Sequence, residues 1–326
     1  MLPKCRRDGI AMSGIPKEIF RSMEKYIDIS CFSFEILEKG GGVSDKIILS
    51  KDGAPRFILR ITPRNCYART YECIDYLYKK GAPFSRPLCG FRLSGTGDYC
   101  LAANWAHGSE LDVNSMKDRS EIYPFARKLA EALHRLHDID VTCGTPCTSM
   151  EDEISLYFRT ISDIGMEFPF KKEFMDFLRD GSSAGLVYDC SFVHMDLHLH
   201  NVVWAQDGQP TLIDYENIMI TDCYREFVYA VSFHGWEEDI FWLAVIFLYF
   251  NGKIPQDFWQ KTRFYSVVHL FRMLIFESRE NDRKKINWLC RTIYNRYNGL
   301  KCAEPDWFIK YKAYIGQLEW ELNQCQ

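Results

Sequence analysis

The sequence has no apolar segment long enough to cross a membrane. Its longest apolar run, residues 240–250, falls short of the roughly 20 residues that a membrane-spanning helix needs, and it therefore indicates a buried core helix. Near the N-terminus, Lys4, Arg6 and Arg7 are not followed by the apolar core of a secretory signal. We therefore expect a cytoplasmic protein with no membrane partner.

The sequence also has little excess charge and no regular cysteine spacing. The formal net charge is −4 over 326 residues, so we expect no nucleic-acid partner. The 13 cysteines form no framework and include no Cys-x-x-Cys pair of the kind found in structural zinc sites. These observations predict free thiols in a reducing cytosol.

Strand and turn signals dominate the first hundred residues. Short runs of strand formers alternate with turns, and Asp52-Gly53 is a hairpin signal between two of them. One helix is expected here, because apolar residues recur at helical spacing across residues 68–79. The expected strands are 32–38, 46–50, 56–61, 87–91 and 98–103.

Helical patterns dominate the rest of the chain. Residues 120–137 carry an apolar stripe at helical spacing, and residues 151–179 are helical with a break near Gly165 and Pro169. From Asp239 onward the pattern is almost entirely helical. The second part of the chain is therefore expected to be mostly α-helical.

This change of character predicts an α+β fold with two lobes around a cleft. We place a β-rich N-lobe at residues 1–104 and a mostly α-helical C-lobe at residues 105–326. The hinge between them is expected at residues 102–108.

The residues most typical of chemistry lie between residues 192 and 216. Apolar strand-like segments flank Asp196, Asn201 and Asp214, and Asp207-Gly208 is a hairpin signal between them. A hairpin there would bring the three polar side chains to one end of a small sheet. Two carboxylates and an amide oxygen suit Mg²⁺, a hard cation that prefers oxygen ligands. Phosphoryl transfer needs such a metal and a carboxylate that orients the hydroxyl nucleophile.

The same segment resembles the signature of the aminoglycoside phosphotransferase and choline kinase families, the small-molecule branch of the protein-kinase-like fold. The matching residues are His194-x-Asp196-x-x-x-x-Asn201 followed by Asp214-x-Glu216. The resemblance extends over roughly residues 34–232.

The resemblance implies a two-lobed protein-kinase-like fold that moves the γ-phosphate of ATP or GTP to a hydroxyl of a small molecule. In this pattern Asp196 is the catalytic base, and Asn201 and Asp214 hold Mg²⁺. His194 braces the catalytic loop from behind. Within and after this motif, three positions depart from the common pattern, namely Met195, His200 and Glu226.

The resemblance also assigns nucleotide-binding residues in the first lobe. A glycine-rich segment between two expected strands is where this fold places its phosphate loop, because glycines let backbone N–H groups approach the phosphates. Arg60 stands in place of the usual nucleotide-anchoring lysine, with Glu72 as its ion-pair partner and Lys46 as the next candidate for the anchor. The other residues assigned to the nucleotide are Gly41, Gly42, Ser44, Ala103 and Trp105.

The same residues permit other interpretations. The spacing of His194, His198, His200 and Cys190 permits a zinc site, but it would leave Asp196 without a role. A protein kinase is not expected, since the chain has no long activation segment and no Ala-Pro-Glu. A kinase-like nucleotide-binding module without activity is a further alternative, although the three motif residues are all present.

The acceptor remains open at this stage. Seven acids and one base lie between residues 214 and 239, which suggests a cationic acceptor such as an amino sugar antibiotic or an amino alcohol, bound by Glu237 and Glu238. Alternatively, these acids form the favourable first turn of the apolar helix that follows. A metabolic kinase of the choline, ethanolamine, homoserine or methylthioribose type is also open, as is the choice between monomer and weak homodimer.

Overall fold

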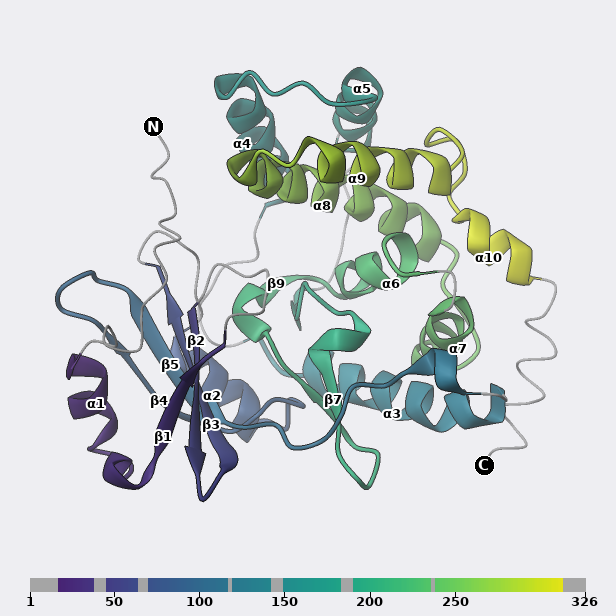
Figure 1. The fold of residues 1–326 in the computed structure, drawn as a ribbon. Coiled ribbons are helices and arrows are strands. Elements are labelled where there is room, and N and C mark those ends of the chain that lie inside the picture. The colour runs from purple at the N-terminus through teal and green to yellow at the C-terminus, as the bar shows by residue number, and fades with distance from the viewer. Residues whose placement is uncertain are drawn as a thin grey trace.

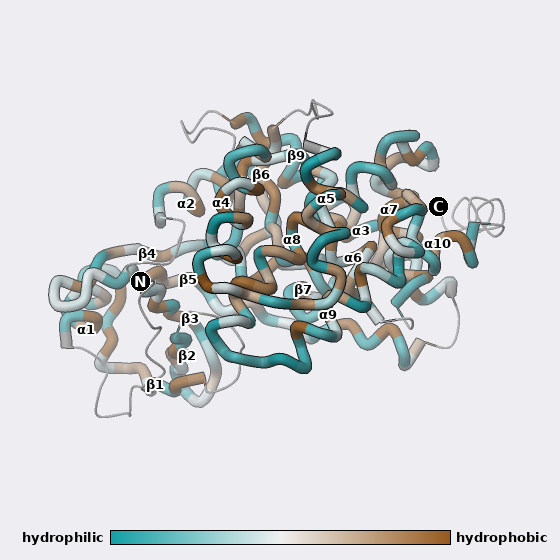
Figure 2. Tube along the Cα trace, turned by 90° about the horizontal axis from the view of Figure 1, so that it is seen from above, coloured by the Kyte–Doolittle hydropathy of each residue, from teal (hydrophilic) through white to brown (hydrophobic). Residues whose placement is uncertain are grey.

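The protein is described here by a computed structural model that combines an antiparallel sheet near the N-terminus with a mostly helical C-terminal part (Figure 1). The sheet and the helices lie side by side in both views of the chain (Figures 1 and 2). This is the predicted α+β architecture, whereas the division of the chain at residue 104 stays a prediction. The structure describes residues 17–37, 45–63, 70–116, 119–141, 149–182, 190–235 and 238–312.

The N-terminal sheet has five strands in the order β1-β2-β3-β5-β4, and all neighbouring pairs are antiparallel. Asp52 and Gly53 both have positive φ, as a tight two-residue hairpin requires, and they join the second and third strands. The strands are β1 Ser33–Ile36, β2 Asp45–Lys51, β3 Ala54–Thr62, β4 Pro87–Arg92 and β5 Tyr99–Asn104.

One face of this sheet forms its own small core. Apolar side chains of β2 and β3 alternate toward α1 (Lys17–Met23), which contributes Ile19 and Met23 to the same cluster. The helix α2 (Tyr71–Lys79) behaves differently, because its buried Ile74 and Leu77 belong to the larger core that the C-terminal helices share. The sheet is therefore tied to the helical part through α2.

The helical part surrounds an extensive apolar core. The helix α7 is buried on nearly all sides, which confirms the core helix expected at residues 240–250. A break in helical structure follows α4, where Gly165 has a φ of +58, and it confirms the predicted interruption. The helices are α3 Arg119–His137, α4 Met150–Asp163, α5 Lys171–Ser182, α6 Val228–Ser232, α7 Asp239–Tyr249, α8 Phe258–Glu280, α9 Arg283–Arg296 and α10 Asp306–Tyr311.

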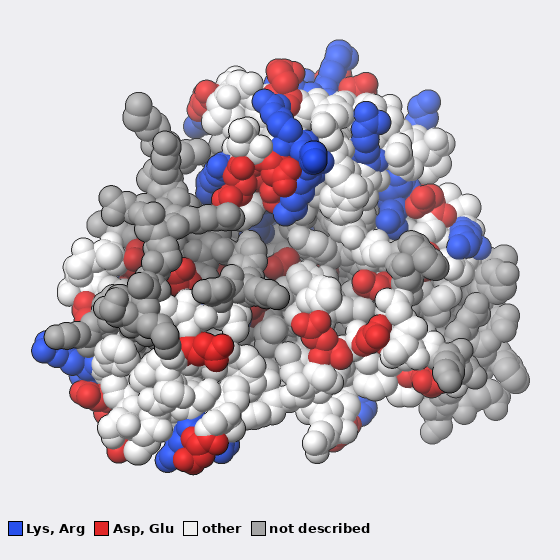
Figure 3. Space-filling view, viewed as in Figure 1, with Lys and Arg blue, Asp and Glu red and all other residues white. Residues whose placement is uncertain are grey.

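Three further features concern helix length, surface charge and the thiols. Within the described residues, no helix is both long and apolar enough to span a membrane. On the face shown in Figure 3, acidic and basic side chains are scattered among uncharged ones. Among the cysteines of the described residues, Cys190 is disulfide-bonded, so the expectation of free thiols throughout was wrong at this position.

Candidate active site

The motif residues lie on a segment of short strands between the sheet and the helices. The hairpin predicted at Asp207-Gly208 is present and joins β7 (Val202–Trp204) to β8 (Pro210–Leu212), with Gly208 at a φ of +73. The flanking strands β6 (Cys190–Val193) and β9 (Met219–Asp222) pair with each other. The segment therefore forms two small sheets instead of the single one expected, because β6 pairs with β9 and not with β7.

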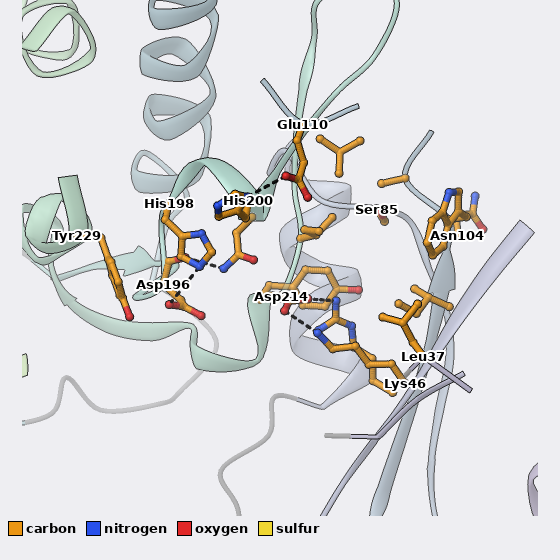
Figure 4. A pocket seen from close by; sticks show the side chains of 18 residues that line it. Leu37, Lys46, Ser85, Asn104, Glu110, Asp196, His198, His200, Asp214 and Tyr229 are labelled. Carbon is orange, nitrogen blue, oxygen red and sulfur yellow. Dashed lines mark hydrogen bonds and ion pairs between the residues drawn. The ribbon is translucent and has the colours of Figure 1, made fainter. Parts of the chain in front are cut away.

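Asp196, Asn201 and Asp214 line one cavity of about 530 Å³ between this segment and the N-terminal sheet. In Figure 4, Asp196 lies toward one end of the cavity with His198 and Tyr229. The other end is lined by residues of the sheet and of the connection after β5, and Asp214 lies between the two ends. The structure thus brings together the three residues that the motif singled out.

Short contacts fix Asp196 in place. The preceding residue, Met195, has a φ of +67, and the side-chain Nδ2 of Asn201 donates a 2.8 Å hydrogen bond to the backbone carbonyl of Asp196. The Tyr229 hydroxyl lies next to the carboxylate, and Nε2 of His198 lies 3.9 Å from it. Burial lowers the pKa of His198, so this ring is neutral at pH 7.

Buried side chains support the loop from behind. The backbone N–H of His194 donates to Oε2 of Glu226 at 2.7 Å, and the His194 Nε2 lies 2.7 Å from the carbonyl of Ile213. His137 lies 3.3 Å from the same Glu226 oxygen. These contacts give His194 the bracing position that the resemblance implied. Glu226, one of the departures from the common pattern, holds the backbone of the loop.

Asp214 is the electrostatic centre of the cavity. It has a left-handed φ of +60 just after β8, and it forms ion pairs with Lys46 at 2.7 Å and with Arg60. Burial favours the neutral acid, but the cations of Arg60 and Lys46 outweigh it and lower the pKa of Asp214 to about 2. This carboxylate is therefore ionised at any physiological pH.

The expected partner of Arg60 was wrong. Arg60 pairs with Asp214 and, at 3.1 Å, with Glu216, whereas Glu72 is exposed on α2. The reason is geometric: Asp214 and Glu216 come directly after β8 and face β3, so they reach the guanidinium. Burial alone would lower the pKa of Arg60, but these two carboxylates raise it well above its usual value.

The other residues assigned to the nucleotide have different positions. Trp105 lines the cavity, while Ala103 is buried within β5 and is not among the lining residues. The backbone N–H of Trp105 donates to the carbonyl of Arg56 at 2.8 Å. Gly41, Gly42 and Ser44 lie outside the described residues.

The described acids of residues 214–239 have partners inside the protein. Asp222 accepts a hydrogen bond from Tyr265, and Asp239 pairs with His234 at 2.8 Å. Glu238 precedes α7, accepts a 2.8 Å hydrogen bond from Nε1 of Trp242 and does not line the cavity. These contacts favour the alternative in which the acids serve the fold, and Glu237 lies outside the described residues.

The donor atoms that face the cavity indicate which metal ion it can hold. Within the ranges that the structure describes, no group of three or more His, Cys, Asp or Glu side chains could hold a metal ion, which leaves the zinc alternative without support. The Nδ2 of Asn201 is held by the Asp196 carbonyl, so its Oδ1 is the atom that can coordinate a cation. Together with the ionised Asp214, this is an oxygen donor set that fits Mg²⁺.

Tyr229, Glu110 and Ser85 also line the cavity but were not foreseen from the sequence. Ser85 lies between α2 and β4, far before the motif in the chain, whereas Tyr229 lies on α6, soon after the motif. Neither carries a spacing signal that would have identified it.

Comparisons with known proteins agree with this geometry. The model of the phosphotransferase enzyme family matches residues 35–264. Among curated protein sequences, none matches this chain.

Solved structures with the same fold include three antibiotic phosphotransferases at low sequence identity. APH(2")-IIa with gentamicin has a TM-score of 0.65 and 14% identity, covering 88% of this chain and 98% of its own. The GDP and kanamycin complex of APH(2")-IIia has a TM-score of 0.60 and 18% identity, with 85% and 97% covered. Spectinomycin phosphotransferase, APH(9)-Ia, with ADP and spectinomycin has a TM-score of 0.59 and 10% identity, with 94% and 98% covered. The chain therefore belongs to the phosphotransferase enzyme family, with the kinase-like fold that its motif predicted.

Proposed function

We propose that this enzyme transfers the γ-phosphate of ATP or GTP to a hydroxyl of a small molecule, with Asp196 as general base and Mg²⁺ held by Asn201 and Asp214. One observation carries the proposal: these three side chains line a single cavity, together with two buried cations from the N-terminal sheet. Carboxylates, an amide and cations are the groups that phosphoryl transfer requires of a protein.

Asp196 accepts the proton of the acceptor hydroxyl. As this proton leaves, the hydroxyl oxygen bonds to the γ-phosphorus, and the bond between the γ-phosphorus and the oxygen that bridges it to the β-phosphate breaks. Tyr229 and His198 hold the carboxylate in position. Mg²⁺, when bound, neutralises charge on the phosphates. Arg60 binds phosphate oxygens, and Gly41, Gly42 and Ser44 are proposed to cover the phosphates. Trp105 and the neighbouring Ala103 are proposed to hold the purine base of the nucleotide. Glu72 has no proposed contact with the nucleotide.

The acceptor class is proposed from the relatives. Similar structures hold kanamycin or gentamicin, which supports an amino sugar antibiotic as acceptor and a role in resistance. The acids of residues 214–239 give less support than their number suggested, because the described ones have internal partners. A metabolic alcohol of the choline, ethanolamine, homoserine or methylthioribose type is the second candidate. We propose a cytoplasmic monomer or weak homodimer.

A coupled assay that follows ADP or GDP production tests the proposal across a panel of aminoglycosides and small alcohols. We expect phosphorylation of at least one hydroxyl compound that requires Mg²⁺ and is lost in Asp196→Ala. Nucleotide binding without turnover on any panel member, unchanged in Asp196→Ala, would support the inactive binding module instead.

A further inference from the structure

Two buried cations face the same carboxylate from adjacent strands. Lys46 on β2 and Arg60 on β3 lie directly opposite each other in the strand register, so their side chains project from the same face of the sheet. Lys46 is 9% exposed and Arg60 is 4% exposed, and both line the cavity. Basic side chains this well buried need a counterion.

Arg60 and Lys46 differ in the number of carboxylates that they contact. Arg60 contacts two carboxylates, Asp214 and Glu216, whereas among the described residues Lys46 forms its ion pair with Asp214. The two cations bind different oxygens of Asp214: Lys46 contacts Oδ2 and Arg60 contacts Oδ1. A metal ion that binds this carboxylate therefore competes with both cations for its charge. Lys46 is the easier to displace, because its flexible stem carries a compact charge and, within the described residues, no second carboxylate anchors it.

We infer that Lys46 is a second nucleotide-binding residue, which leaves Asp214 and moves to a phosphate oxygen when the metal–nucleotide complex enters. This inference rests on the function proposed above. In the state seen here Lys46 occupies the carboxylate and opposes metal binding. In the nucleotide-bound state it offers a charged hydrogen bond to a phosphate, while Asp214 is released to the cation. Arg60 stays anchored on Glu216 throughout.

The exchange predicts two effects of opposite sign for Lys46→Met. The Kd for Mn²⁺ alone, measured by electron paramagnetic resonance as a stand-in for Mg²⁺, should fall about 10-fold because a competing cation is gone. The Kd for ATP or GTP in the presence of a chelator should rise about 10-fold or more, because a hydrogen bond between charged groups is lost. Activity does not enter either measurement.

Lys51→Met is the matched control. Lys51 is on the same strand, is exposed and does not line the cavity. The same loss of charge there should therefore change neither the Kd for Mn²⁺ nor the Kd for the nucleotide. Lys46→Gln serves if Lys46→Met lowers the thermal midpoint so far that binding cannot be measured, since it removes the charge but keeps a polar side chain. We expect the same two shifts with it.

Two outcomes overturn the inference. If the variants bind both Mn²⁺ and nucleotide as the wild type does, Lys46 is only a structural counterion of Asp214. If both affinities fall together, Lys46 supports the site and does not compete with the metal. Failure of the proposed function looks different, because then the wild-type protein would show no Asp196-dependent turnover of any acceptor, a result that neither binding constant reports.

Discussion

The two ends of the cavity differ in the chemistry that they present. Toward the sheet, the described lining residues include two cations: Lys46 pairs with Asp214, and Arg60 pairs with Asp214 and Glu216. Toward the helices, the walls around Asp196 are the neutral ring of His198 and the phenol of Tyr229. The first end suits a polyphosphate, and under the proposed function the second would present the Asp196 carboxylate to the acceptor.

This difference explains why the nucleotide is easier to infer than the acceptor. Every nucleotide of this kind carries the same phosphates, so its end of the cavity needs fixed charges that a motif can encode. The acceptor end has no comparable requirement beyond one base, and its other walls come from side chains whose type varies with the acceptor. Variants at either end, at Asp214 between the ends and at Glu238 outside the cavity lining test this difference.

The largest effect is expected at the acceptor end, from Asp196→Ala. Loss of a general base should lower kcat by about 10²–10⁴-fold while the nucleotide Kd stays unchanged. Steady-state kinetics and a nucleotide titration measure both quantities. Glu131→Ala, which changes an exposed acid on α3 outside the cavity lining, is the control and should keep full activity. More than about a tenth of the activity in Asp196→Ala would remove Asp196 from the base role.

The next effect is expected where the two ends meet, at Asp214. Asp214→Asn should lower kcat/KM for the metal–nucleotide complex by about 10²-fold or more, since a metal ion contributes several kcal/mol to charge stabilisation. Asn201→Ala should cost less, because an amide supplies a dipole and no charge. Titrations of activity against Mg²⁺ measure this. An unchanged Mg²⁺ dependence in Asp214→Asn would contradict the metal assignment.

At the nucleotide end, Arg60→Ala should raise the nucleotide KM by about 10- to 100-fold, as loss of hydrogen bonds between charged groups does. The change in kcat should be smaller, because Arg60 binds ground-state phosphates. Arg56→Ala, on the same strand but exposed, is the matched control. A nucleotide KM that does not move would place the anchor elsewhere.

A smaller effect is expected from Tyr229→Phe, which keeps the ring and removes the hydroxyl that contacts Asp196. We expect kcat to fall about 3- to 10-fold, the typical range for one hydrogen bond, with the nucleotide KM unchanged. Tyr224→Phe lies close by in the chain but outside the cavity lining and should leave kcat unchanged. Equal values for both variants would show that the Tyr229 hydroxyl does not position the base.

The smallest effect is expected from Glu238→Gln. Glu238 accepts a hydrogen bond from Trp242, which a glutamine oxygen can also accept, and it does not line the cavity. The KM for the acceptor should therefore stay the same. If that KM rose, and if the rise shrank with added salt, Glu238 would belong to an acidic acceptor surface after all.

The sequence predicted much of the site because its key residues are close together in the chain. The β7–β8 hairpin follows from Asp207-Gly208, and it holds Asn201 and Asp214 on neighbouring strand ends. The N-terminal sheet followed in the same way from strand runs and a hairpin turn. Strand runs and turn pairs depend only on residues that are close together in the chain, so they can be recognised from the sequence alone.

The sequence by itself therefore determined the fold class, the family and the motif residues Asp196, Asn201 and Asp214. Only the tertiary structure decided which side chains meet them. It paired Arg60 with Asp214 across 154 residues and Lys46 with Asp214 across 168, and it left Glu72 exposed on α2. Contacts over such separations depend on how the sheet packs against the catalytic segment, and no local spacing encodes that packing.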